Sequence, residues 1–168
     1  LEASYNRWIV TASRPDDHVL NIVRRDDPRN VRTGWSFAER AYNFDSAAGI
    51  NYTVDVTKPY GSRIVITTMA DGRPFNFGET YNVAMTSYRA NGGGGLLAEA
   101  GIDTDTISER TVEYYPEIRE ILYDYLRKNR VIDPAVIGDP AVIGHWSFVP
   151  EKVAGPAIER DLGLLFGR

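Results

Sequence analysis

The sequence predicts an α+β domain in which a mixed β-sheet is covered by helices. Residues 50–56 and 80–88 alternate apolar and polar side chains, as half-buried strands do. Residues 63–69 are rich in β-branched side chains, which favour a strand between these two. Residues 116–129 instead repeat apolar side chains at helical spacing. With 168 residues, of which 43 % are apolar, we expect residues 1–168 to fold as a single domain with its own core.

The N-terminal part of the chain begins with a helical pattern. Its apolar residues recur at the spacing of one helix face, at Leu1, Tyr5, Trp8, Ile9 and Ala12. Pro15 disfavours helical backbone in the residue before it, so the helix is expected to end there. Residues 19–23 indicate a short strand or a turn. The charged and irregular residues 24–40 indicate an exposed loop.

The middle of the chain predicts three strands joined by turns. The first has its apolar residues at alternate positions, namely Ile50, Tyr52, Val54 and Val56. A turn at residues 58–61 leads to the strand at 63–69, and Asp71-Gly72 is typical of a hairpin. The third strand, 80–88, is expected to carry Tyr81, Val83 and Met85 on one face. Asn82, Ala84, Thr86 and Tyr88 would then point the other way.

The C-terminal part predicts helices and one further strand. Residues 96–100 begin a helix, and Pro116 suits the first position of a longer one that ends near Asn129. Its apolar stripe consists of Ile118, Ile121, Leu122, Tyr125 and Leu126, and Lys128 and Arg130 suit its C-terminal end. Residues 146–149 predict a strand. Residues 134–139 are nearly repeated by 140–145, which indicates a local duplication in a loop.

Composition excludes several classes of function. The formal net charge of −4 offers no basic footprint for a nucleic-acid polymer, although a small anionic ligand needs only one or two placed cations. The chain has no cysteine, so disulfides, thiolate metal sites and cysteine nucleophiles are excluded. No stretch approaches the roughly 20 apolar residues that a membrane span requires.

Catalytic chemistry has few candidate residues. The chain has two histidines, His18 and His145, so a dinuclear metal site of the phosphoesterase type cannot be assembled from it. Asp16, Asp17 and His18 offer metal ligands, but carboxylates before an apolar run are more often turn or capping residues. No G-x-S-x-G motif is present. We therefore expect no catalytic residue and no metal ligand in this chain. A self-contained hydrolase that uses His18 remains an alternative.

A run of glycines follows the third predicted strand, at residues 92–95. The run lacks the Lys-Ser/Thr of a P-loop, but it suits a place where the backbone approaches another group closely. Tyr88 at the strand end is a candidate for stacking on a planar ring, or else an ordinary half-buried tyrosine. Arg89 is a candidate phosphate ligand, with a surface salt bridge as the simpler interpretation. Arg63 is expected to be structural.

Three motifs in a fixed order resemble the C-terminal domain of the 5'-nucleotidase family. They are residues 49–55 (Gly-Ile-Asn-Tyr-Thr-Val-Asp), 59–64 (Pro-Tyr-Gly-Ser-Arg-Ile) and 81–93, which ends in Tyr-Arg-Ala-Asn-Gly-Gly. Residues 1–2 and 16–18 also resemble the family's helix and following turn, so the resemblance covers about residues 1–150. The family includes bacterial UDP-sugar hydrolases and 2',3'-cyclic-nucleotide 2'-phosphodiesterases. The resemblance implies that this chain has a fold like that of the 5'-nucleotidase C-terminal domain.

The resemblance also implies how the site is divided. Family members hold two divalent metal ions in an N-terminal metallophosphoesterase domain, and their C-terminal domain sandwiches the base between two aromatic rings. Tyr88 matches one ring, and the substrate-binding residues carried over are Tyr88, Asn91, Gly92, Gly93 and Gly94. In the family the other ring lies in an upstream, glycine-rich segment that has no counterpart in this sequence, so this sequence is expected to be an N-terminally truncated domain. The metal ions would belong to the catalytic domain, with no cofactor in this chain.

One departure from the family pattern narrows the implied substrate. The nucleotidase branch reads Asn-Gly-Gly-Asp and holds the ribose with the acidic side chain, whereas Gly94 stands at that position here. The sequence is more similar to the cyclic-nucleotide phosphodiesterase and 3'-nucleotidase branch. We therefore expect a recognition domain for nucleotide catabolism, inactive alone, with a nucleotide and the metallophosphoesterase domain of the same polypeptide as partners. Family resemblance implies a periplasmic or otherwise exported protein. The alternatives are a stand-alone nucleoside-binding domain and a structural domain without catalysis.

Overall fold

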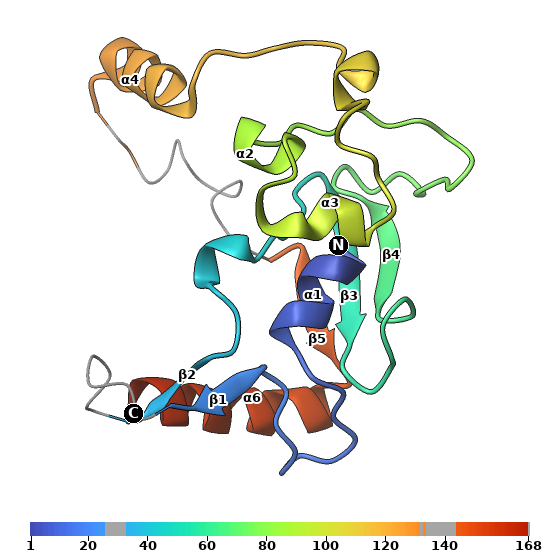
Figure 1. The fold of residues 1–168 in the computed structure, drawn as a ribbon, viewed down its shortest axis with the longest axis vertical. Coiled ribbons are helices and arrows are strands. Elements are labelled where there is room, and N and C mark those ends of the chain that lie inside the picture. Colours follow the sequence, from blue (N-terminus) through green and yellow to red (C-terminus); the bar gives the residue numbers. More distant parts are fainter. Residues whose placement is uncertain (26–32, 132, 134–143, 168) are drawn as a thin grey trace.

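A mixed three-stranded sheet lies at the centre of the molecule. The computed structural model describes residues 1–25, 33–131, 133 and 144–167. In this part of the chain, β3 (Ile50–Asp55) pairs antiparallel with β4 (Ile64–Met69) and parallel with β5 (Trp146–Val149), in the order β4-β3-β5. Figure 1 shows the sheet with helices beside it. The α+β prediction and these three predicted strands are confirmed.

The core lies between β3 and two helices, α1 (Glu2–Trp8) and α6 (Glu151–Phe166). The alternation along β3 turns Tyr52 and Val54 inward, where they are 2 % and 0 % exposed. Tyr5 of α1 is fully buried, and its hydroxyl lies 2.9 Å from that of Tyr52. Burial raises the pKa of Tyr5, so its hydroxyl stays neutral and acts as a hydrogen-bonding group inside the core. Its ring also makes edge contacts with Phe44, Trp146 and Phe148.

The C-terminal helix α6 was not predicted from the sequence, because Pro156 and two glycines interrupt the pattern. Tertiary packing overrides this weak propensity, since Val153, Ala154 and Ala157 are buried in the core. Asp161 of α6 is 0 % exposed, and one carboxylate oxygen accepts hydrogen bonds from the backbone N–H groups of Val19 and Leu20 at 2.8 and 2.9 Å. Its other oxygen lies 2.6 Å from Nδ1 of His18.

Two predictions for the N-terminal region are wrong in part. The first helix ends at Trp8, and Ile9 is extended and bridges Leu20, so backbone pairing with the following segment replaces the last helical turn. Within the predicted loop 24–40, β2 (Trp35–Phe37) pairs antiparallel with β1 (Ile22–Arg24). Phe37 stabilises this small sheet by packing on Trp8, with ring centroids 4.7 Å apart. Residues 26–32 lie outside the described residues.

The third predicted strand is also wrong. Residues 80–86 are not in a strand, and α2 (Ser87–Ala90) begins where the strand was expected to end. Asp71 and Gly72 do form a tight turn, in which Gly72 donates its N–H to the carbonyl of Met69. The chain then forms a local aromatic cluster in which Phe75 stacks on Tyr81 at 4.9 Å. This cluster uses an apolar residue of the expected strand, and an alternating pattern becomes a strand only where a partner edge accepts its hydrogen bonds.

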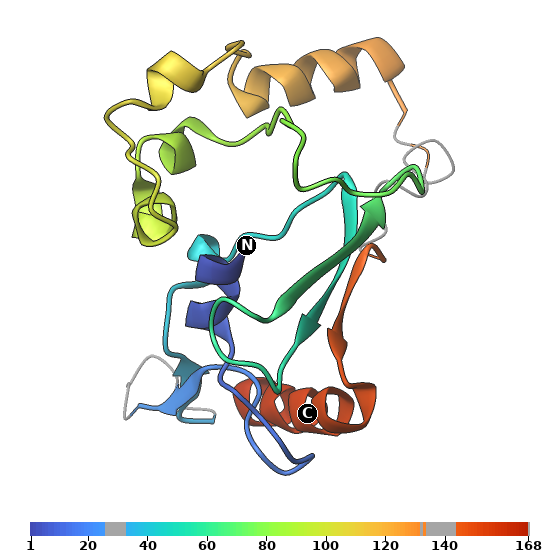
Figure 2. The ribbon, with the colours of Figure 1, turned by 90° about the vertical axis from the view of Figure 1, so that its right-hand side faces the viewer.

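The remaining elements are short, except for one helix. Their bounds are η1 (Ala41–Asn43), η2 (Gly93–Gly95), α3 (Leu96–Glu99), η3 (Ile107–Arg110) and α4 (Ile118–Asn129). The helices predicted at 96–100 and 116–129 are therefore confirmed, but α4 begins at Ile118 with Glu117 as its N-cap, so the prediction that Pro116 takes the first helical position is wrong. α4 stands apart from the sheet (Figures 1 and 2), so the expected covering by helices holds for α1 and α6 but not for α4. The duplicated segment falls mostly on residues 134–143, outside the described residues.

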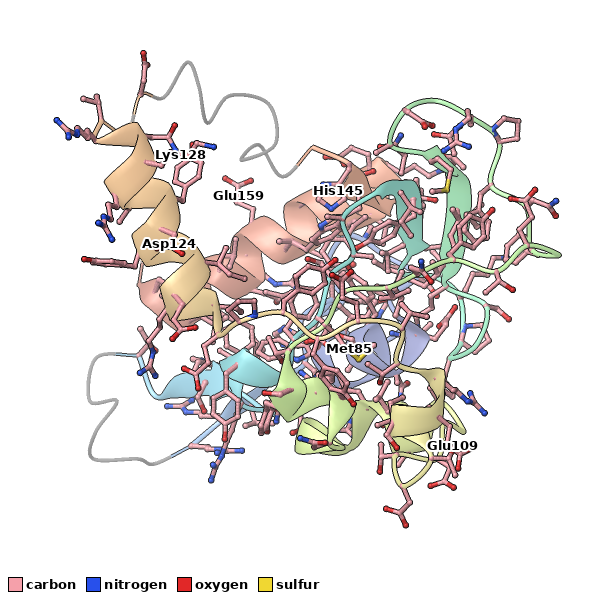
Figure 3. The ribbon with its side chains drawn as sticks, turned by 90° about the horizontal axis from the view of Figure 1, so that it is seen from above. Met85, Glu109, Asp124, Lys128, His145 and Glu159 are labelled. Carbon is pink, nitrogen blue, oxygen red and sulfur yellow. The ribbon has the colours of Figure 1, made fainter. Side chains whose placement is uncertain are left out.

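Replacing Asp161 by Ala removes the acceptor of two backbone N–H groups and the partner of His18. We expect the free energy of unfolding to fall by about 2–4 kcal/mol, because the buried donors are left unsatisfied. Urea denaturation measures this change. Glu159→Ala is the matched control, because Glu159 is exposed on the same helix (Figure 3) and its loss should cost no more than about 0.5 kcal/mol. Equal losses for the two variants would contradict this role of Asp161.

Candidate functional site

The glycine run folds into a tight loop directly after α2. Gly92, Gly94 and Gly95 have φ angles of 84°, 74° and 70°, which lie in the left-handed region that favours glycine. Three such residues within four positions turn the chain back toward α2 and then into α3. The glycines are therefore needed for the backbone conformation. The run connects two short helices, α2 and α3, and does not follow a strand as predicted.

Tyr88 lies on α2, not at the end of a strand as predicted, and the glycine loop packs against it. A Cβ atom at Gly93 would come within 2.6 Å of the Tyr88 ring and 2.4 Å of its carbonyl oxygen, so no side chain fits there. The Tyr88 hydroxyl donates a hydrogen bond to Oδ1 of Asn43 at 3.3 Å. The residue nevertheless remains 51 % exposed. Its ring is thus held from the side of the loop and presents its remaining surface to solvent.

Arg89 connects Tyr88, the loop and the segment before β3. Its guanidinium forms a two-pronged ion pair with Asp45, with Nη2–Oδ1 at 2.7 Å and Nε–Oδ2 at 2.6 Å. It also donates a hydrogen bond to the carbonyl of Gly93, and its central carbon lies 5.6 Å from the centroid of the Tyr88 ring. Arg89 is only 6 % exposed. In the expected salt bridge the arginine is therefore buried while the side chain of Asp45 is 41 % exposed, and the pair engages the guanidinium considered for phosphate binding.

Residues of the core helix α1 contact the glycine loop and hold it in place. Arg7 donates a hydrogen bond to the carbonyl of Gly94 and forms an ion pair with Glu99 of α3 at 2.8 Å. Ser4 accepts a hydrogen bond from the backbone N–H of Asp45 at 2.7 Å. Two arginines thus donate hydrogen bonds to two loop carbonyls, and each arginine also forms an ion pair with a carboxylate. This arrangement orders the loop without a ligand.

The remaining predicted site residues fall into two groups. A Cβ atom at Gly94 would lie 2.5 Å from Nη1 of Arg89 and 2.6 Å from Oδ1 of Asn43, at a left-handed φ angle. An acidic side chain cannot be accommodated there without displacing these groups, in agreement with the departure from the nucleotidase pattern. Asn91 is the C-cap of α2, three residues after Tyr88, and it is exposed. Tyr88 and Asn91 therefore offer side chains to a ligand, whereas the glycines act through the backbone.

Sequence reasoning missed Arg7, Asn43 and Asp45, which hold the loop and Tyr88. The pairs Tyr88–Asn43 and Arg89–Asp45 are 45 and 44 residues apart in sequence, and no local pattern marks such partners. The expectation for Arg63 agrees with the structure. Its guanidinium donates to the carbonyl of Ile9 at 3.1 Å, and burial lowers its pKa with partial compensation from Glu2.

The acidic turn considered for metal binding has structural partners. Asp17 accepts hydrogen bonds from the backbone of Ser13 and from Arg14, which lower its pKa to about 2. His18 is paired with Asp161. Across residues 1–25, 33–131, 133 and 144–167, no group of three or more histidine and acidic residues is close enough to hold a metal ion. No helix in these ranges is long and apolar enough to cross a membrane.

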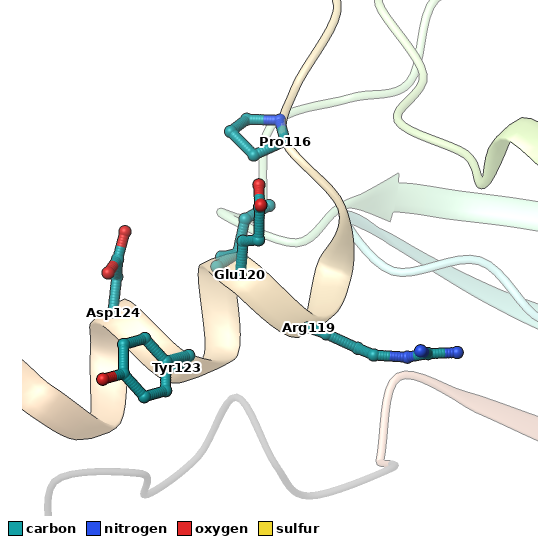
Figure 4. Close-up of a pocket in the computed structure, with 6 residues that line it drawn as sticks. Pro116, Arg119, Glu120, Tyr123 and Asp124 are labelled. Carbon is teal, nitrogen blue, oxygen red and sulfur yellow. The ribbon is translucent and has the colours of Figure 1, made fainter.

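A shallow hollow lies elsewhere, on the surface of α4 (Figure 4). Its lining consists of Pro116, Arg119, Glu120, Ile121, Tyr123 and Asp124. All of these belong to α4 or to the turn before it, and none is a predicted site residue. The hollow therefore follows the surface of one helix and adds nothing to the site around Tyr88.

Replacing Gly93 by Ala should displace the Tyr88 ring, because the new methyl group would overlap it. We expect a loss of about 1–3 kcal/mol in the free energy of unfolding, together with shifted ring resonances of Tyr88 in NMR spectra. Gly78→Ala is the control, since neither glycine has a left-handed φ angle and a Cβ at Gly78 comes no closer than 3.3 Å to another group. Unchanged Tyr88 resonances in Gly93→Ala would show that the loop does not hold the ring.

Two known sequences or families resemble the sequence of this chain. A trifunctional nucleotide phosphoesterase protein of Bacillus subtilis (strain 168), YfkN, is 29 % identical over 134 residues. The match covers 73 % of this chain but 8 % of that protein, so the chain spans a small part of its relative's length. No solved structure gives a significant match. The family model described as "5'-nucleotidase, C-terminal domain" matches residues 17–100, which is half of the chain and contains β3, β4, Tyr88 and the glycine loop. This chain therefore belongs to the 5'-nucleotidase C-terminal domain family.

Proposed function

We propose that this chain is the nucleotide-recognition part of a metal-dependent phosphoesterase, and that Tyr88 stacks on the base of the substrate. The half-exposed ring of Tyr88, fixed against the glycine loop, carries this proposal. A solvent-facing tyrosine usually samples several rotamers, whereas this one is positioned by Gly93, Asn43 and Arg89. An aromatic surface that is already ordered loses less entropy when a planar ring stacks on it.

The surroundings of Tyr88 support a nucleoside as the ligand. Tyr88 is 51 % exposed on the side away from the glycine loop's contact, and the exposed amide of Asn91 offers both a donor and an acceptor to a base edge or a sugar. Gly94 supplies no carboxylate for a ribose diol. This favours a substrate whose ribose hydroxyls are esterified, such as a 2',3'-cyclic nucleotide or a 3'-nucleotide, over a 5'-nucleotide.

In this proposal the chain binds the nucleotide, and residues of a different domain cleave the phosphate ester. In a metal-dependent phosphoesterase, bound divalent ions activate water for attack on phosphorus. The described residues of this chain present no ligand cluster for such ions, so we assign the metals to a metallophosphoesterase domain of the same polypeptide. Stacking on Tyr88 would hold the base while the phosphate lies over the metals. Binding energy would thereby be converted into orientation of the reacting ester.

Titration of the chain with adenosine and with 3'-AMP tests this proposal. One stacked base contributes roughly 1–3 kcal/mol, so we expect binding at about millimolar strength or weaker. NMR should show local shifts of the Tyr88 ring and of the Gly92–Gly95 amides. Tyr88→Ala should abolish the shifts and Tyr88→Phe should keep them, because phenylalanine retains the stacking surface.

Tyr115→Ala provides the matched control, since Tyr115 is also exposed (68 %) and is not part of the site. Its loss should leave the titration unchanged. Equal effects of Tyr88→Ala and Tyr115→Ala would reveal non-specific stacking. An absence of local shifts at ligand concentrations of about tens of millimolar would contradict nucleotide recognition by this chain.

A further inference from the structure

The hydroxyl end of Tyr88 is bordered by the turn η1. Asn43 of this turn accepts a hydrogen bond from the Tyr88 hydroxyl at 3.3 Å. Its neighbour Tyr42 is 62 % exposed, and the Tyr42 hydroxyl accepts a hydrogen bond from Nη1 of Arg40 at 2.7 Å. Arg40 is the N-cap of η1, and its guanidinium lies 6.0 Å from the centroid of the Tyr42 ring. The turn therefore brings an arginine next to the candidate site.

Arg40 differs from the two arginines that hold the glycine loop. Arg7 and Arg89 are both paired with carboxylates. In the part of the chain that the structure describes, Arg40 forms no ion pair, and its Nε and Nη2 make no hydrogen bond. These two nitrogens form one side of the guanidinium and present parallel N–H donors. Arg40 is exposed, so these donors are accessible to a ligand.

Electrostatics also links Arg40 to the candidate site. Its hydrogen bond to Tyr42 raises the pKa of Arg40 above the usual value, and Tyr88 adds a smaller contribution of the same sign. The guanidinium is therefore charged at every pH at which the protein is folded, and it lies within electrostatic range of the Tyr88 hydroxyl.

The contacts of Tyr88 determine which side a base can use. Arg89 lies over one face of the ring, and the glycine loop packs along its Cδ2–Cε2 edge. A base therefore stacks on the other face. A purine is larger than a tyrosine ring, so a stacked purine extends beyond its rim. Because the proposed function assigns the phosphate to metals of another domain, the polar groups beside the ring are available to the base.

These polar groups are mostly hydrogen-bond donors. The Tyr42 hydroxyl already accepts from Arg40, so its own O–H group remains to donate. Asn43 uses Oδ1 to accept from Tyr88, so its remaining polar atom is the donor Nδ2. Together with the free N–H groups of Arg40, this end of the site favours a base edge that carries acceptors. Among purines, guanine and hypoxanthine carry two adjacent acceptors, O6 and N7, whereas adenine carries a donor at N6 beside N7.

We propose that Arg40 selects 6-oxopurine nucleotides, in which the base is guanine or hypoxanthine, by donating two hydrogen bonds to O6 and N7 of the base that stacks on Tyr88. This inference rests on the proposed function, because it uses the same stacking contact, and it adds a base preference. Adenine is disfavoured because its amino group would face an N–H group of the guanidinium. Tyr42 contributes by holding Nη1, which leaves the Nε–Nη2 side for the base.

Inosine and adenosine test this preference without a phosphate, because they differ at the Watson–Crick edge and at position 6 of the purine. In NMR titrations of the 168-residue chain, we expect inosine to bind about five- to ten-fold more tightly than adenosine, as followed by the Tyr88 ring resonances. The Nε–H resonance of Arg40 should shift with inosine and not with adenosine. The analogue 7-deazainosine lacks N7 and should bind about as weakly as adenosine.

Substitutions of Arg40 separate base selection from stacking. Arg40→Gln should reduce the affinity for inosine to that for adenosine and leave adenosine binding unchanged. Arg40→Lys keeps the charge but not the parallel donors, so it should also lose most of the preference. Arg119→Gln is the matched control, because Arg119 is an exposed arginine on α4 and its loss changes the net charge equally. The control should keep the preference, and circular dichroism verifies that the variants are folded.

The possible outcomes distinguish this inference from the proposed function. If both nucleosides shift Tyr88 with equal affinity, base selection is overturned and the proposed function stands. A preference for inosine that survives Arg40→Gln would also overturn the role of Arg40. So would an Arg40→Gln variant that loses affinity for 3'-AMP but not for inosine, because Arg40 would then bind the phosphate. If neither nucleoside shifts Tyr88, the proposed function fails and the inference fails with it.

Discussion

The burial of Tyr5 determines where the rest of the molecule can lie. This side chain joins α1 to the central strand through the hydroxyl pair with Tyr52, and four aromatic rings surround it. A buried hydroxyl needs such a partner, so α1 has one orientation on the sheet. The same helix carries Ser4 and Arg7, which bind Asp45 and the carbonyl of Gly94. The position of the glycine loop therefore follows from the packing of the core.

The candidate site depends on this support because its own elements are short. α2 and α3 have four residues each, which is too few for stability without tertiary contacts. The ion pairs of Arg7 and Arg89 connect these turns to α1 and to the segment before β3. Partial burial strengthens such pairs relative to exposed ones, but removal of one partner leaves a charge uncompensated. Tyr88 is ordered as a consequence of this network, and its open surface is available to a ligand.

Residues 80–86 and α4, in contrast, have clear sequence patterns but few tertiary contacts that cover them. Both show clear periodicity, at a spacing of two and of 3.6 residues, yet most of their apolar side chains remain exposed. Val83 is 72 % exposed, for example, and Ile118 is 65 % exposed. A periodic pattern shows that a segment has an apolar face, but it does not say which surface covers that face.

The sequence by itself determined the elements whose signals are local. Alternation predicted β3, β-branched residues predicted β4, helical spacing predicted α4, and the family motif identified Tyr88 and the glycine loop. Tertiary structure alone decided α6, β2, the helical setting of Tyr88 and the pairing of Arg89 with Asp45. These features depend on contacts between residues far apart in sequence, such as the 143 positions between His18 and Asp161. Local propensity cannot report such contacts, because the stabilising energy belongs to the pair and not to either segment.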